Sequence, residues 1–193
     1  MKRFWKRSLI PVLVFSMAPC ALAQARPALE ALIHSLASTQ TYGEVAISPD
    51  GARVAWSQPL HDSSGAATWN SAIYLAEVAN PAGRRRITGG NGDNDYSERA
   101  VAWSPDGKKL AFLSNASDQA ELYVADAAGG AAHKLTELTG YLAAPAWSPD
   151  GKTIALLYTE NAPRAAGPLM PMTPETGVIG SKIYEQRLTT VDI

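Results

Sequence analysis

The side chains of this 193-residue chain that could do chemistry are few and poorly spaced for it. A serine nucleophile on a strand-to-helix turn would appear as Gly-x-Ser-x-Gly, and the sequence contains no such motif. Three histidines, His34, His61 and His133, could act as bases, but none has a serine or acidic partner at motif spacing. The sequence therefore predicts no catalytic residue.

One polar stretch matches a calcium-binding loop at its first three ligand positions but not at two later positions. Asn91, Asp93 and Asp95 alternate as the first three ligands of such a loop would. The next position should be glycine but is Tyr96, and the twelfth should be glutamate but is Ala102. We therefore expect a solvated loop here, and neither a metal site nor a cofactor.

The first 23 residues have the features of an export signal. Four cations precede an apolar stretch, Leu9–Ala18, and Ala21–Ala23 fits the small-x-small cleavage pattern. The apolar stretch is too short to span a bilayer, which needs about 20 residues. Cleavage between Ala23 and Gln24 would also remove Cys20, the only thiol. We expect an exported protein, periplasmic or secreted, without a stable membrane anchor after cleavage.

The charge of the expected mature chain argues against one class of partner. Cleavage would leave 13 Lys and Arg against 18 Asp and Glu, a formal charge of −5. Arg84–Arg86 is the longest basic run, and such a surface does not attract phosphate backbones. We expect no nucleic-acid partner.

Three copies of Ser-Pro-Asp-Gly organise the rest of the chain, at intervals of 56 and 44 residues. The order suits a type I turn, in which Ser accepts a local backbone bond, Pro sets φ and Gly releases the fourth position. Large-Ala-large triplets on both sides predict two strands with one large and one small face. The predicted structural turns are Ser48, Pro49, Asp50 and Gly51; Ser104, Pro105, Asp106 and Gly107; and Ser148, Pro149, Asp150 and Gly151.

A second hairpin follows in the first two copies, with predicted turns at 80–83 and 127–130. Four short strands per copy predict a propeller blade. We therefore expect an all-β fold, a partial β-propeller of about three four-stranded blades at 42–90, 97–138 and 141–193.

The third copy is expected to be incomplete. Residues 188–192 align with the third strand of the unit, 122–126, so the fourth strand is missing. Because propellers close with four to eight blades, the sequence predicts a piece of a longer protein with an exposed sheet edge.

Two segments depart from the repeat. Residues 26–38 predict a short amphipathic helix with Leu29, Leu32, Ile33 and Leu36 on one face, expected to cover part of the propeller. The third copy also carries about 22 extra residues within 158–186, and an insertion of this length is typical of a functional loop.

The repeat and its Leu-Tyr-Val-Ala-Asp-Ala-Ala-Gly-Gly hairpin resemble the PD40 (WD40-like, TolB-type) propeller repeat. That repeat occurs in TolB-like periplasmic proteins and in the N-terminal propellers of prolyl oligopeptidase-type (S9) serine peptidases. The leading helix and the insertion are similar to secreted dipeptidyl and acylaminoacyl peptidases. The resemblance implies a non-catalytic propeller that gates peptide substrates for a C-terminal α/β-hydrolase domain that this sequence lacks.

The insertion brings both signs of charge into a loop that the repeat does not require. In dipeptidyl peptidases of the resembled family, propeller acids pair with the α-ammonium of the substrate. Glu160 and Glu185 are the candidates for this role, with Arg164 as a partner for a carbonyl or carboxylate. The alternative is a TolB-like periplasmic module that binds a protein partner and has no enzymatic activity.

Overall fold

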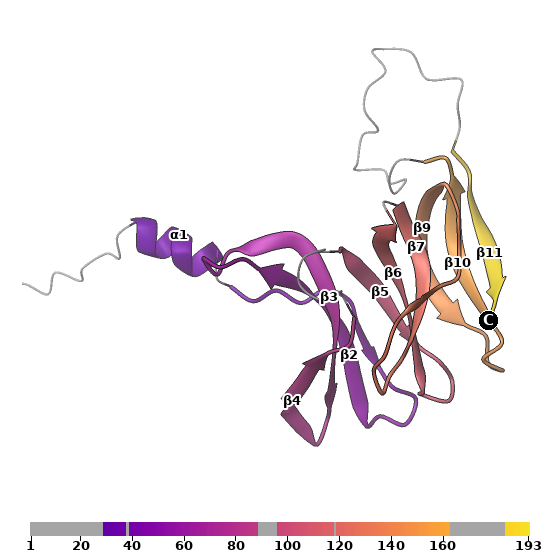
Figure 1. Ribbon diagram of the computed structural model, residues 1–193, viewed down its shortest axis with the longest axis horizontal. Coiled ribbons are helices and arrows are strands. Elements are labelled where there is room, and N and C mark those ends of the chain that lie inside the picture. Colours follow the sequence, from indigo (N-terminus) through magenta and orange to yellow (C-terminus); the bar gives the residue numbers. More distant parts are fainter. Residues whose placement is uncertain (1–28, 38, 89–95, 118, 163–183) are drawn as a thin grey trace, which may run out of the picture.

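The computed structural model describes residues 29–37, 39–88, 96–117, 119–162 and 184–193. These residues form one helix, α1 (Leu29–Ala37), and eleven strands in three antiparallel sheets. Figure 1 shows the sheets side by side in an open arc, with the chain passing from one sheet to the next. The predicted partial β-propeller is therefore confirmed, and each sheet is one blade.

Within each blade the strands are neighbours in sequence order. Blade 1 consists of β1 (Val45–Ile47), β2 (Arg53–His61), β3 (Ala67–Glu77) and β4 (Asn80–Arg86). Blade 2 consists of β5 (Glu98–Trp103), β6 (Lys109–Ser117), β7 (Gln119–Asp126) and β8 (His133–Lys134). Blade 3 consists of β9 (Gly140–Trp147), β10 (Thr153–Glu160) and β11 (Gln186–Asp192).

The Ser-Pro-Asp-Gly turns join the first two strands of every blade in one geometry. In blade 2 the N–H of Gly107 donates to the carbonyl of Ser104 at 2.9 Å, and the N–H of Lys109 donates to Ser104 Oγ at 2.8 Å. Asp106 accepts from the N–H of Lys108 at 3.0 Å. The glycine has φ of +68°, with +71° and +70° at its two counterparts, a left-handed conformation that favours glycine. The predicted turn chemistry thus holds in all three copies.

Neighbouring blades are joined by an apolar layer and by a repeated tryptophan contact. Trp103 Nε1 donates to the carbonyl of Ala46 in blade 1 at 3.0 Å, and Trp147 Nε1 donates to that of Ala102 in blade 2 at 3.2 Å. The small alanine face of one blade lets the large residues of the next approach closely, as the repeat predicted. The layer between blades 1 and 2 includes Ala55, Ile73, Leu75, Val101, Trp103, Leu110 and Phe112. The layer between blades 2 and 3 includes Ala111, Leu113, Leu122, Val124, Leu142, Ile154 and Leu156.

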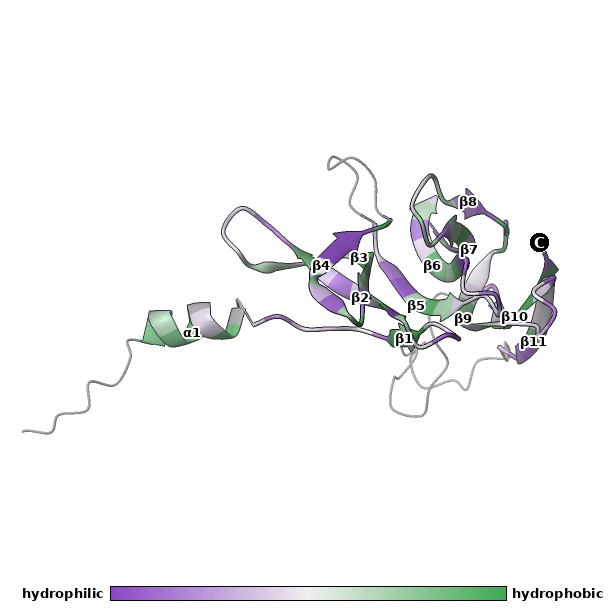
Figure 2. Cartoon of the chain, turned by 90° about the horizontal axis from the view of Figure 1, so that it is seen from below, coloured by the Kyte–Doolittle hydropathy of each residue, from purple (hydrophilic) through white to green (hydrophobic). Residues whose placement is uncertain are grey.

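The structure corrects two details of the expected fold. The turn between β3 and β4 lies at Val78–Ala79, before the predicted 80–83, because Glu77 and Asn80 pair and close a two-residue loop. Helix α1 does not cover the propeller, since an extended segment carries it away from blade 1 (Figure 2). Its apolar residues are exposed: Leu29, Leu32, Ile33 and Leu36.

Candidate functional site

The two ends of each blade differ in the connections between strands that they contain. One end carries the Ser-Pro-Asp-Gly turns and the other carries the connections from second to third strand. We call the latter the loop end. In blade 3 that connection contains the insertion, and the strands beside it place Glu160 and Glu185 at the loop end.

Glu160 and Glu185 lie where the chain leaves β10 and where it enters β11. Glu160 is the last residue of β10, and Glu185 precedes β11, one position beyond the last cross-strand pair, Thr159 with Gln186. Both carboxylates are exposed. Glu185 Oε2 accepts from Arg187 Nη2 at 3.0 Å, and this hydrogen bond, with a weaker contribution from Glu160, raises the pKa of Arg187. Of the two predicted acids, Glu185 therefore forms an ion pair with Arg187, and Glu160 adds only a weaker electrostatic contribution.

Arg164, the third predicted residue, lies outside the described residues, as does the Asn91–Asp95 stretch. The candidate site therefore consists of Glu160, Glu185 and Arg187 on blade 3. Of these, Arg187 was not among the site residues that the sequence indicated. It stands one position inside β11, at the place that Glu121 holds in β7.

Two residues with positive φ, Gly140 and Asn161, shape the backbone next to Glu160. Gly140 pairs with Glu160 and has φ of +148°, and a Cβ there would come within 2.3 Å of the carbonyl of Thr159. Asn161 has φ of +54°, and its N–H donates to the carbonyl of Thr139 at 2.9 Å. These contacts fix the direction in which the chain enters the insertion.

Thr159 contributes a buried hydroxyl beside the site. Its side chain is fully buried, and its Oγ1 has no hydrogen-bond partner among the residues that the structure describes. Next to it, Tyr158 donates its hydroxyl to the carbonyl of Thr139 at 3.0 Å. Partial burial, together with the charge of Glu160, raises the pKa of Tyr158. Tyr158 is therefore a neutral hydrogen-bond donor at neutral pH.

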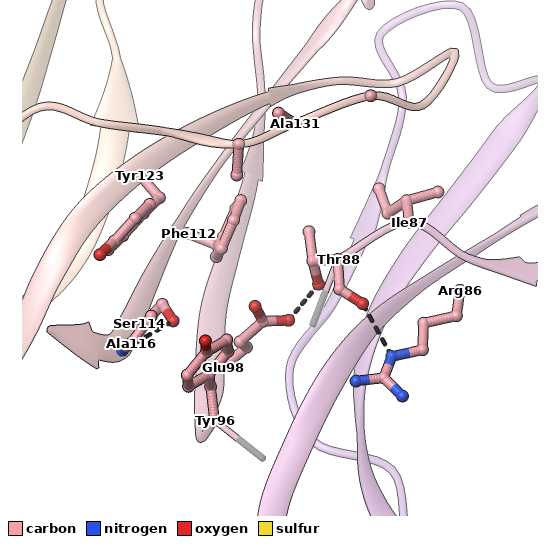
Figure 3. A pocket seen from close by; sticks show the side chains of 12 residues that line it. Arg86, Ile87, Thr88, Tyr96, Glu98, Phe112, Ser114, Ala116, Tyr123 and Ala131 are labelled. Atoms are coloured by element: carbon pink, nitrogen blue, oxygen red, sulfur yellow. Dashed lines mark hydrogen bonds between the residues drawn. The ribbon is translucent and has the colours of Figure 1, made fainter. Parts of the chain in front are cut away.

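A pocket of about 540 Å³ lies between blades 1 and 2 (Figure 3). Ser114, on its wall, has the same place in β6 as Tyr158 has in β10, so this part of the pocket lies toward the loop end. Phe112 and Tyr123 stack on its blade 2 side with ring centroids 6.0 Å apart. The sequence did not indicate this pocket, because its walls come from positions that the repeat uses for packing.

Glu98 gives the pocket a buried carboxylate, with 3% of its surface exposed. It accepts hydrogen bonds from the hydroxyl of Thr88 and, at 3.2 Å, from the N–H of Ile73, both in blade 1. Arg86 donates from Nε to the carbonyl of Thr88 at 2.7 Å. Because the bonds of Glu98 to Thr88 and Ile73 cross from blade 2 to blade 1, Glu98 joins the blades besides lining the pocket.

A smaller groove of about 330 Å³ shares Glu98 and opens beside β1. Its rim carries Tyr42 and Trp69, and Trp69 is 98% exposed. Arg99, also on the rim, places its guanidinium 5.4 Å from the centre of the Tyr141 ring. The loop end thus presents aromatic and charged side chains over all three blades.

Neither a cluster of metal-ligating side chains nor a membrane-spanning helix occurs among the described residues. No group of three or more His, Cys, Asp or Glu side chains there could hold a metal ion. None of the described helices has the length and apolar character needed to cross a membrane.

The family of the chain follows from its repeats. A family model for PD40, the TolB β-propeller domain, matches residues 35–166. The chain belongs to this family. A curated relative, the uncharacterized peptidase YuxL of Bacillus subtilis (strain 168), is 35% identical over 103 residues. The match covers 50% of this chain and 14% of that protein.

Solved structures of a TolB-like protein and of a peptidase share the fold of this PD40 domain. A putative TolB from Agrobacterium tumefaciens has a TM-score of 0.53 at 17% identity, over 80% of this chain and 46% of that one. The acylaminoacyl peptidase of Pyrococcus horikoshii has a TM-score of 0.51 at 17% identity, over 66% of this chain and 18% of that one. The chain therefore spans less than half the length of these relatives.

Proposed function

We propose that this PD40 domain is the non-catalytic propeller of an exported serine peptidase and that it helps to position peptide substrates for an α/β-hydrolase domain. The observation that carries the proposal is the 35% identity over 103 residues with a curated peptidase. The absence of Gly-x-Ser-x-Gly from the 193 residues assigns the chemistry to another part of such an enzyme. Export is proposed from the N-terminal residues, which lie outside the described part of the structure.

Glu160 and Glu185 are proposed to hold the α-ammonium of the peptide. They stand at the entrance and exit of the insertion. Glu185 accepts a hydrogen bond from the Arg187 guanidinium, and Glu160 adds a weaker electrostatic contribution. The α-ammonium group of a peptide can take the place of that guanidinium by donating the same charge-assisted hydrogen bonds to the carboxylates. Because both carboxylates are exposed, solvent screens these contacts, and we expect each to contribute at most about 1 kcal/mol.

The test compares two peptides that differ only in the N-terminal charge. A C-terminally labelled peptide with a free N-terminus should bind the chain, and its N-acetylated form should bind about three- to tenfold more weakly. The double change Glu160→Gln, Glu185→Gln should abolish that difference, as read by fluorescence anisotropy. Glu77→Gln, at an exposed acid on β3 of blade 1, is the matched control. Equal binding of the two peptides to the unmodified chain would contradict the assignment.

A TolB-like interaction module is the second candidate. It is favoured by the description of the matching family and by the 80% coverage of this chain in the TolB-like structure. The coding sequence beyond Ile193 separates the two. A segment with Gly-x-Ser-x-Gly supports the peptidase, whereas further Ser-Pro-Asp-Gly repeats followed by a stop codon support the module.

A further inference from the structure

The junctions between neighbouring blades differ at the end of the blades that carries the Ser-Pro-Asp-Gly turns. Between blades 1 and 2 this junction contains the side chain of Arg53, which stands two positions after the first turn glycine. Between blades 2 and 3 the same end contains a pocket of about 430 Å³. All residues that line the pocket lie within 104–109 and 147–151, the two turns and their flanks. The first junction is therefore a template for the second.

The contacts of Arg53 show which groups surround a side chain at the first junction. Its guanidinium donates from Nη2 to the carbonyl of Gly107, in the turn of blade 2, at 2.7 Å. The guanidinium carbon lies 4.9 Å from the centre of the Trp103 ring, a cation–π distance. The carboxylate of Asp50, in the turn of blade 1, lies 4.0 Å from Nη2. A carbonyl, an indole ring and a carboxylate thus surround one guanidinium.

The pocket at the second junction contains the counterparts of these three groups. They are Gly151, Trp147 and Asp106, at the same places in the repeat as Gly107, Trp103 and Asp50. The two turns are also equally close at both junctions. A Cβ at Gly107 would lie 3.7 Å from Cδ of Pro49. A Cβ at Gly151 would lie 3.7 Å from Cδ of Pro105. The second junction therefore reproduces the first, apart from the residue in the position of Arg53.

Lys109 stands in that position and does not take over the contacts of the guanidinium. Its hydrogen bonds to Ser104 use only the backbone N–H and C=O. In the described part of the chain its ammonium group makes no cation–π contact with Trp147 and no hydrogen bond to Gly151. Trp147 is only half-buried, whereas Trp103 is 8% exposed. The ring of Trp147 and the carbonyl of Gly151 are therefore open to another group.

Two carboxylates give the pocket a net negative charge. Asp106 and Asp150 both line it, against the ammonium of Lys109. Each aspartate uses Oδ1 within its own turn, where it accepts a backbone N–H at 3.0 Å or 3.1 Å. The N–H of Lys108 at Asp106 and the hydroxyl of Ser148 at Asp150 lower the pKa of each carboxyl, so both are charged at neutral pH. Their Oδ2 atoms accept no hydrogen bond from the residues that the structure describes.

We propose that the pocket between the Ser-Pro-Asp-Gly turns of blades 2 and 3 binds a guanidinium group, as carried by arginine. The group donates to the carbonyl of Gly151 and to the carboxylate of Asp106, and it lies against the ring of Trp147. A further blade would pack beside blade 3 and not between blades 2 and 3, so the propeller itself does not fill the pocket. The site is separate from Glu160 and Glu185, which lie at the loop end.

The probe is N-acetyl-arginine methylamide, whose only charge is the guanidinium, titrated against the isotope-labelled chain by NMR. We expect a Kd of about 1–10 mM, with saturable shifts of the Trp147 indole N–H and the Gly151 amide. N-acetyl-citrulline methylamide carries an uncharged urea instead and should bind about tenfold more weakly. Both possible sources of the guanidinium support the site: tighter binding of free arginine than of the capped form identifies the amino acid, and weaker binding identifies an arginine within a polypeptide.

Lys109 allows a test from within the protein. Lys109→Arg places a guanidinium after the second turn, as Arg53 stands after the first. It should weaken probe binding about tenfold or more and raise the melting temperature by about 1–3 °C. Lys109→Ala removes a competing ammonium and should tighten binding about threefold. Lys108→Arg is the matched control, because Lys108 is exposed on the same turn and does not line the pocket.

Several outcomes would overturn the proposal. Equal binding of the arginine and citrulline probes would show that the guanidinium is not recognised. Unchanged probe binding in Lys109→Arg, or shifts confined to residues outside 104–109 and 147–151, would place the ligand elsewhere. The absence of saturable shifts would show that the pocket binds no such group. Because Lys109 and Lys108 are exposed, each variant is expected to keep the fold.

Discussion

Thr159 carries the clearest single-residue consequence of the candidate site. Its hydroxyl is buried without a partner in the described part of the molecule, and such a group costs about 1–3 kcal/mol. Thr159→Val replaces the hydroxyl by a methyl group of similar size in a strand, where valine is favoured. We expect the free energy of unfolding to rise by about 1 kcal/mol in urea denaturation. Thr190→Val, at an exposed position of β11, should change little.

A lower stability of Thr159→Val would contradict this account and would indicate that the hydroxyl has a partner in the folded chain.

Only part of the candidate site could be predicted from the sequence. Glu160 and Glu185 were found because an insertion interrupts a repeat. The bonds of Glu98 across two blades join residues 10 and 25 positions apart, and no local pattern records them. The burial of Thr159 likewise depends on packing in the folded chain.

The Ser-Pro-Asp-Gly turns make stability depend on pH. The pKa of each turn aspartate is lowered, chiefly by the serine hydroxyl at Asp50 and Asp150 and by the N–H of Lys108 at Asp106. The unfolded carboxyls titrate near 3.8, so the turns contribute stability above that pH. This contribution is lost as the pH falls through the lower folded values.

We therefore expect the melting temperature to fall between about pH 5 and pH 2, and to fall less in a chain with Asp50→Asn, Asp106→Asn and Asp150→Asn. Thermal melts followed by circular dichroism measure both curves. Asp126→Asn, outside the three turns, should leave the pH profile unchanged. Parallel curves for the unmodified chain and the triple variant would show that the turn carboxylates do not cause the acid sensitivity.

At the scale of elements, the turns and strands could be predicted because each copy repeats the same local chemistry. The place of α1 could not, although its apolar periodicity predicted a helix. An amphipathic helix is expected to pack its apolar face against another surface, but the pattern does not identify that surface. Leu32 and Ile33 are half exposed in this structure, so the helix exists without the contact that its pattern suggested.

The tryptophan contacts join neighbouring blades across the whole arc. Trp103→Phe removes a hydrogen bond to Ala46 and part of a buried ring, and should lower the free energy of unfolding by about 1–3 kcal/mol. Guanidinium denaturation measures the loss. Trp69→Phe is the control, because Trp69 is 98% exposed and should change stability by less than about 0.5 kcal/mol. Equal effects of the two changes would contradict the role of the contact.

The direction of the tryptophan contacts has a consequence for synthesis. Each tryptophan lies in the first strand of a blade and donates to a carbonyl in the blade that precedes it in the chain. When the ribosome releases that first strand, the acceptor surface already exists. Each blade can therefore assemble on its predecessor during translation, and the N-terminal blade serves as the template for the others.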